Sequence, residues 1–169
     1  AQYDAASGDT ESAISFTIAF NDISGNAGTP VTAVTNSSSV TFDKTLPTLS
    51  DVGIASTNPT DTLAIVNDVI TVTFTAIEAV GTKVVTFSSA GVAIDPSRVN
   101  YVNTTGNTYT ASYTAVGSDP DGAVTYSIAV GDLAGNSGNP VTSGTGNVTF
   151  DNLLPDATSV TIASNHPLV

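Results

Sequence analysis

Two stretches of this chain carry nearly the same sequence, which narrows the choice of folds more than any other property. Residues 13–32 read AISFTIAFNDISGNAGTPVT, and residues 123–142 read AVTYSIAVGDLAGNSGNPVT, at an offset of 110. After a two-residue deletion the match resumes, so that 37–56 aligns with 144–164 and Asp43 meets Asp151 at an offset of 108. A repeat of this length indicates successive copies of one unit of domain size.

The repeat also predicts how the chain is divided. Residues 1–45 match only the second half of a unit, residues 46–153 make one complete unit, and residues 154–169 match only the first strand of a third. We therefore expect the E, F and G strands of one repeat, then a complete repeat, then the beginning of the next. Such a division is typical of a piece of a longer tandem array.

Alternation of apolar and polar residues predicts strands throughout the complete unit. In 69–77, for example, Ile70, Val72 and Phe74 alternate with threonines. Further strands are expected at 49–54, 83–88, 99–102, 109–115, 124–130 and 141–150, separated by turn residues. This pattern predicts an all-β fold of tandem immunoglobulin-like β-sandwiches, with about seven antiparallel strands per repeat. A β-barrel is the alternative, whereas the period is too long for a β-solenoid.

The charge of the chain is strongly one-sided. Fifteen acidic residues stand against Lys44, Lys83 and Arg98, which gives a net charge of −12. Nucleic acids and anionic lipids bind basic patches, so neither is expected as a partner. No apolar run is long enough to span a bilayer, so membrane insertion is not expected either. The acidity favours cations.

Catalysis is not expected. His166 is the single histidine and cysteine is absent, so neither a nucleophile–base pair nor a zinc site can be assembled. Two carboxylates could in principle hydrolyse a glycoside, but the acids fall at the ends of the predicted sandwich and no tryptophan is present to stack on a sugar. We expect His166 to be an exposed turn residue.

The acidic residues are predicted to gather at the junctions between repeats. Antiparallel strands place their loops at two poles, and one pole should receive the ends of strands B and F beside the incoming linker. This places five acids at the first junction: Asp9, Glu11, Asp43, Glu78 and Asp132. A second junction would hold Asp119, Asp121 and Asp151. Carboxylates this close repel one another unless a cation lies among them, and Ca²⁺ takes six to eight oxygen ligands. The alternative is that these acids are solvated turn residues.

The strings VTFDKTLPTLSDVGIAS, TVTFTAIEA, GAVTYSIAVGDLAGNSG and SVTIAS resemble the immunoglobulin-like repeats of giant bacterial surface adhesins, such as the extender repeats of ice-binding and biofilm adhesins. The resemblance covers almost the whole chain. It implies an extracellular location on a bacterial surface and calcium at the junctions. It further implies that Asp43 and Asp151 are the linker aspartates and Glu78 the acid closing strand B. The second linker departs from the pattern, reading DNLLPDAT rather than DKTLPT.

Three functions remain open from the sequence. The first is a structural spacer of a long adhesin or surface fibre, whose partners are neighbouring repeats of the same chain. The second is a module that binds a glycan or a protein, for which Tyr101, Tyr109 and Tyr113 could form a ligand face. The third is a subunit of a self-assembling extracellular filament, because the incomplete first repeat leaves open strand edges that other copies could fill.

Overall fold

The computed structural model describes residues 2–165, so the prediction for His166 falls outside the described residues. Apart from one short 3₁₀ turn, η1 (Pro96–Arg98), the regular elements are strands. Their bounds are β1 (Ser12–Ala13), β2 (Thr41–Phe42), β3 (Leu49–Ser56), β4 (Leu63–Ala64), β5 (Val69–Ala76), β6 (Val80–Ser89), β7 (Val92–Ala93), β8 (Asn100–Thr105), β9 (Thr108–Thr114), β10 (Gly122–Asp132) and β11 (Val148–Phe150).

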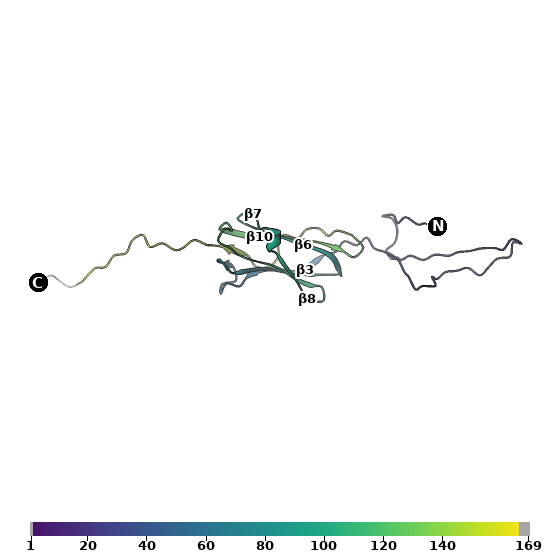
Figure 1. The fold of residues 1–169 in the computed structure, drawn as a ribbon, viewed down its shortest axis with the longest axis horizontal. Coiled ribbons are helices and arrows are strands. Elements are labelled where there is room, and N and C mark those ends of the chain that lie inside the picture. The colour runs from purple at the N-terminus through teal and green to yellow at the C-terminus, as the bar shows by residue number, and fades with distance from the viewer. Residues whose placement is uncertain (1, 166–169) are drawn as a thin grey trace.

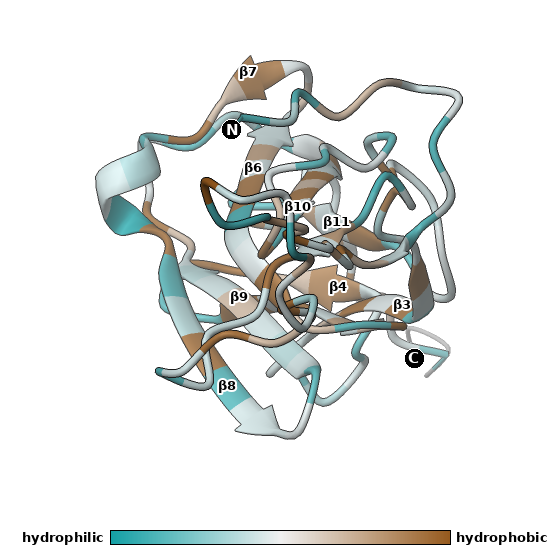
Figure 2. Cartoon of the chain, turned by 90° about the vertical axis from the view of Figure 1, so that its right-hand side faces the viewer, coloured by the Kyte–Doolittle hydropathy of each residue, from teal (hydrophilic) through white to brown (hydrophobic). Residues whose placement is uncertain are grey.

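Two sheets face one another over a common core. One has the order β3-β5-β9-β8 and the other the order β4-β11-β10-β6-β7, and Figure 2 shows them as separate layers in a view along the long axis. The ladders are antiparallel except for the pairing of β11 with β4. When the two-residue strands β4 and β7 are left out and the others are lettered in chain order from β3, one sheet reads A-B-E-D and the other contains C, F and G. This is the arrangement of an immunoglobulin-like sandwich, so the predicted all-β sandwich is confirmed.

The core follows from the period-two alternation. Ile70, Val72 and Phe74 of β5 are fully buried, while the threonines between them point outward. The same holds on the opposite sheet, where Ile128 is fully buried and Phe87 is 1% exposed. Because successive side chains of a strand point to opposite faces, one face of each sheet contributes to the core and the other meets solvent.

The last strand differs from the prediction. Regular pairing is confined to β11, rather than spanning 141–150. Before it, the chain crosses between the sheets: Val141 exchanges backbone hydrogen bonds with Ile128 of β10, whereas Thr145 exchanges them with Val52 and Ile54 of β3. A segment that serves both sheets cannot keep the regular ladder of one.

Segments outside the sandwich extend from its two ends (Figure 1). Residues 12–42 form a long hairpin closed by β1 and β2, and residues 154–165 form an extended strip without regular structure. Apolar side chains of the hairpin are exposed, among them Phe16 at 38% and Ile18 at 55%. The predicted division at 45/46 and 153/154 stays a prediction.

Candidate metal centre at the linker

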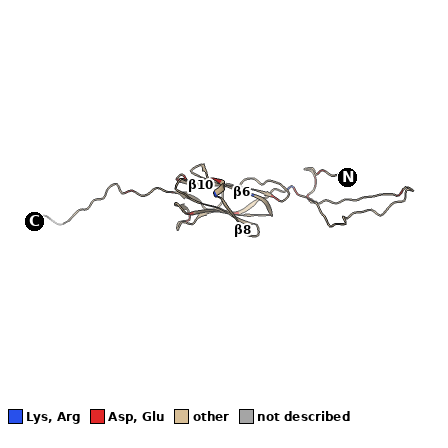
Figure 3. Ribbon diagram, in the orientation of Figure 1, with Lys and Arg blue, Asp and Glu red and all other residues tan. Residues whose placement is uncertain are grey.

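Three carboxylates meet where the linker enters the sandwich. Asp43 lies in the linker just after β2, Glu78 in the turn between β5 and β6, and Asp132 at the end of β10. One carboxylate oxygen from each lies within 4.8 Å of the other two. Asp132 is 5% exposed, and the other two side chains are partly buried. Figure 3 shows acidic residues at both ends of the sandwich, but this is the one such cluster among the described residues.

Asp132 is held in place by the loop that follows it. Its Oδ1 accepts hydrogen bonds from the backbone N–H groups of Gly135 and Asn136, at 2.7 and 2.8 Å, and its Oδ2 accepts one from the Asn136 side chain at 2.7 Å. Burial alone would raise the pKa of Asp132, but the hydrogen bonds from Asn136 and Gly135 outweigh it and keep the pKa below its ordinary value. The carboxylate is therefore ionised and oriented.

The linker is docked onto the same loop. The Asn136 side chain also donates to the backbone carbonyl of Asp43 at 3.2 Å. Two further linker residues are held against the sandwich. Pro47 is buried, and the Thr48 carbonyl accepts a hydrogen bond from the Ile77 N–H at 3.0 Å. Gly138 lies so close to the Pro47 carbonyl that a side chain there would collide with it. The backbone of the linker is thus fixed beside the three carboxylates.

Asp9 and Glu11 lie beside the linker but make other contacts. Glu11 accepts hydrogen bonds from the backbone N–H of Lys44 at 2.7 Å and from the Thr45 hydroxyl at 2.9 Å. Asp9 accepts from the backbone N–H of Ala6, while the Lys44 ammonium donates to the Asp9 carbonyl at 2.8 Å. The pKa of Asp9 is lowered chiefly by the Ala6 N–H, and that of Glu11 chiefly by the Lys44 N–H. These two acids anchor the linker from the other side and do not join the cluster.

The acids predicted for the second junction do not form a cluster of three carboxylates among residues 2–165. Asp119 forms a two-pronged ion pair with Arg98, at 2.6 and 2.7 Å. Asp121 accepts from the backbone N–H of Asn152, and Asp151 from that of Leu153. Because the Arg98 guanidinium already neutralises Asp119, this carboxylate is a poor candidate for a metal ligand. The roles predicted for the other two as ligands stay predictions.

The triad is a group of carboxylates that could hold a metal ion. Calcium–oxygen bonds of about 2.3–2.6 Å allow two oxygens on one ion to lie at most about 5.2 Å apart. The triad oxygens lie within 4.8 Å of one another, so each pair falls below that limit.

Sequence reasoning missed two parts of this site. It did not predict that the Asn136 side chain binds the linker. It gave no role to Gly138, although its conservation between the copies, as Gly28 and Gly138, was a usable signal. Arg98 was also overlooked as the partner that removes Asp119 from the acidic set.

No protein-family model matches the chain, and no curated protein matches its sequence. Within residues 2–165 the structure has no helix that is long and apolar enough to cross a membrane.

Proposed function

We propose that this chain is a spacer module of a long extracellular bacterial adhesin or surface fibre, and that Ca²⁺ at the linker stiffens it. The observation that carries the proposal is the position of Asp43. This residue belongs to the segment that enters the sandwich, whereas Glu78 and Asp132 belong to the sandwich itself. An ion held by all three ties the two parts together.

The electrostatics of the triad favour a bound cation. Three carboxylates within 4.8 Å repel one another, and no lysine or arginine of residues 2–165 is paired with them. A divalent ion would replace this repulsion with attraction. Extracellular modules bind calcium with dissociation constants of about 10⁻⁴–10⁻³ M, which external calcium near about 10 mM would exceed about 10- to 100-fold.

A spacer role is also supported by the repetition of structure along the chain. The hairpin of residues 12–42 and the corresponding strands of the sandwich use the same pairing, with Ser12 opposite Phe42 as Gly122 is opposite Phe150. The linkers that follow are held alike, since Lys44 and Asn152 each donate a backbone N–H to an acid of the loop before the hairpin. Units joined in one way form an extended array.

Calcium binding to the 169-residue chain tests the proposal. We expect isothermal titration to give one site with a dissociation constant of about 10⁻⁴–10⁻³ M. Asp43→Asn combined with Glu78→Gln should weaken binding at least about tenfold. Asp151→Asn is the matched control, because Asp151 occupies the same position in the repeat but lies outside the acidic cluster. Equal binding by all three proteins would contradict the calcium site.

Stiffening is a separate measurement. Small-angle scattering with calcium should give a longer and narrower distribution of dimensions than scattering with EGTA, and trypsin should cut faster after Lys44 in EGTA. At 10 mM calcium, about 10–100 times the dissociation constant, binding adds about 1.4–2.7 kcal/mol to the docked state. The sandwich itself should stay folded, since its core contains no metal ligand other than the edge residue Asp132. Identical curves in the two buffers would exclude the stiffened spacer.

A second candidate, a subunit of a self-assembling filament, is favoured by the exposed apolar side chains of the hairpin. Ile14, Phe16, Ile18 and Phe20 are 37–55% exposed. A partner strand or sheet could cover them, with about 1.5–3 kcal/mol for each side chain that becomes fully buried. Light scattering across a concentration series distinguishes the two candidates, because only the filament subunit should grow in mass.

A further inference from the structure

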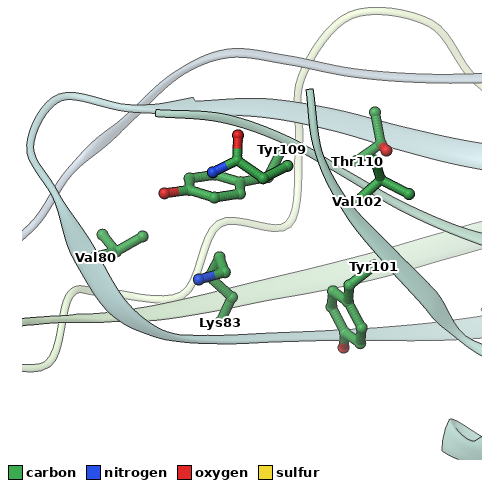
Figure 4. A pocket seen from close by; sticks show the side chains of 7 residues that line it. Val80, Lys83, Tyr101, Val102, Tyr109 and Thr110 are labelled. Atoms are coloured by element: carbon green, nitrogen blue, oxygen red, sulfur yellow. The ribbon is translucent and has the colours of Figure 1, made fainter. Parts of the chain in front are cut away.

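A hollow opens at the side of the sandwich between the edges of the two sheets. Its volume is about 360 Å³, at the small end of the range for ligand sites. Figure 4 shows its lining: Lys83 and Val80 come from β6, Tyr101 and Val102 from β8, and Tyr109 and Thr110 from β9. Asn103 of β8 also lines it. None of these lining residues is acidic, although the chain carries a net charge of −12.

Lys83 occupies a position that the strand pattern reserves for an apolar residue. It shares the inner face of β6 with Val85 and Phe87, which are 2% and 1% exposed. Its ammonium lies 4.7 Å from the centre of the Tyr109 ring. Within residues 2–165 it forms neither a salt bridge nor a hydrogen bond, whereas Arg98 is paired with Asp119 and Lys44 donates to two carbonyls. A charge in a core-facing position breaks the local rule and suggests a function.

The backbone of Lys83 also faces the hollow. The backbone N–H and C=O of Val85 both form hydrogen bonds with the Tyr101 hydroxyl, at 2.8 and 3.1 Å. They therefore point away from β10. Phe87 directs its carbonyl the same way, toward the Ile94 N–H. Alternate residues of a strand point their backbone groups to the same side, so the N–H and C=O of Lys83 face the open edge. Their neighbour across the ladder, Val130, turns its own carbonyl to Gly138.

We propose that this hollow binds the C-terminal end of an extended polypeptide. The Lys83 ammonium pairs with the terminal carboxylate, and the backbone N–H and C=O of Lys83 pair with the last peptide unit as a short added strand. Val80 and Tyr109, which are 8% and 7% exposed, offer an apolar floor for the last side chain. The next residue of β6 whose backbone faces outward is Val85, and the Tyr101 hydroxyl already binds its N–H. The added strand must therefore end before Val85. This explains why a chain end, rather than the middle of a strand, is the fitting ligand.

The site does not depend on the proposed calcium centre, since none of its lining residues belongs to the triad. Its test uses the 169-residue chain labelled with ¹⁵N and the probe N-acetyl-Ala-Leu, which has a free carboxylate. We expect the probe to shift the amide signals of Lys83, Val102 and Asn103. The same peptide with a C-terminal amide should bind at least about tenfold more weakly, because it lacks the charge that pairs with the ammonium.

Variants separate binding from folding. Lys83→Met keeps the length of the side chain and should weaken the probe about tenfold or more, whereas Lys44→Met, at a lysine outside the hollow, should not change it. The acid–amide comparison on the unaltered chain stands even if Lys83→Met fails to fold. Equal binding of acid and amide, or no shifts at 10 mM probe, would overturn the proposal. Shifts of the same amides by galacturonate but not by the dipeptide would overturn it too, in favour of an acidic glycan.

Discussion

The hairpin of residues 12–42 and the strand pair of residues 122–150 are two copies of one sequence in two surroundings. Their backbone pairing agrees residue by residue. Ile18 bridges Val31 as Ile128 bridges Val141, and the next bridge, Asn21 with Ala27, repeats as Gly131 with Ser137. The pairing therefore needs only the segment itself, because the turn and the alternation set the register.

Burial differs completely between the two copies. Ile18 is 55% exposed and Ile128 is fully buried, while Phe16 is 38% exposed and its counterpart Tyr126 is 8% exposed. The second copy faces the sheet β3-β5-β9-β8, and the first has no such sheet among the described residues. A hairpin can thus form its hydrogen bonds locally, but its apolar face is buried only where another sheet covers it.

The acidic loop shows the same contrast. Asp22 accepts from the backbone and side chain of Asn26, just as Asp132 accepts from those of Asn136. Only Asp132 meets two further carboxylates. The loop geometry is local, whereas the candidate metal centre depends on segments that are distant in sequence.

The largest expected difference between the copies is in their apolar cores. Ile128→Ala should lower the free energy of unfolding by about 2–5 kcal/mol, because it leaves a cavity in a close-packed interior. Ile18→Ala, the same change at the same repeat position, should alter it by about 0.5 kcal/mol or less. Urea unfolding followed by tyrosine fluorescence measures both. Similar costs at the two positions would mean that the hairpin is buried in solution.

The next difference concerns a glycine of the repeat. Gly138→Ala should destabilise the sandwich by about 1–3 kcal/mol, since the new methyl group meets the backbone carbonyl of Pro47. Gly28→Ala meets only the ring of Phe20, which is 53% exposed and free to turn away, so its effect should be much smaller. Thermal unfolding compares them. An undisturbed melting temperature in Gly138→Ala would show that the linker is not docked as described.

The smallest difference is expected for the aspartates of the two preceding loops. Asp119→Asn should lower the free energy of unfolding by about 1–2 kcal/mol. The ion pair contributes no more than this because the Arg98 side chain is 27% exposed and water weakens the attraction. Asp9→Asn should leave the urea midpoint almost unchanged, since Asp9 has no arginine partner and lies outside the sandwich. Urea midpoints at neutral pH provide the comparison, and equal costs would show that the Arg98 pair contributes nothing specific.

Lowering the pH tests the contribution of the Asp119–Arg98 ion pair in a second way. The hydrogen bonds from Arg98 are the main cause that keeps the pKa of Asp119 below its ordinary value of 3.8. A lowered pKa means that the ionised form stabilises the fold above the unfolded pKa, and that this contribution is lost as the pH falls through the folded pKa. The advantage of the unaltered chain over Asp119→Asn should therefore be constant above about pH 5 and shrink below about pH 4. An advantage that does not shrink between about pH 4 and about pH 2 would contradict the ion-pair account.

Sequence reasoning predicted most of the fold and part of the site. The alternation in 69–77 and 124–130 predicted β5 and β10, because period two is a property of the strand alone. Placing loops at two poles brought Asp43, Glu78 and Asp132 to one end, where the structure also has them. It could not separate them from Asp9 and Glu11, because the direction of an exposed side chain depends on contacts such as those with Lys44.

By itself, the sequence determined the turn and the pairing register of both copies of the repeat, because these depend on neighbours within one hairpin. The tertiary structure alone decided which copy is buried, which acids meet, and that Lys83 lines a hollow beside Tyr109. These outcomes require segments far apart in the chain to pack against one another. Two copies with nearly the same residues therefore end in different environments, since burial is a property of what covers a strand.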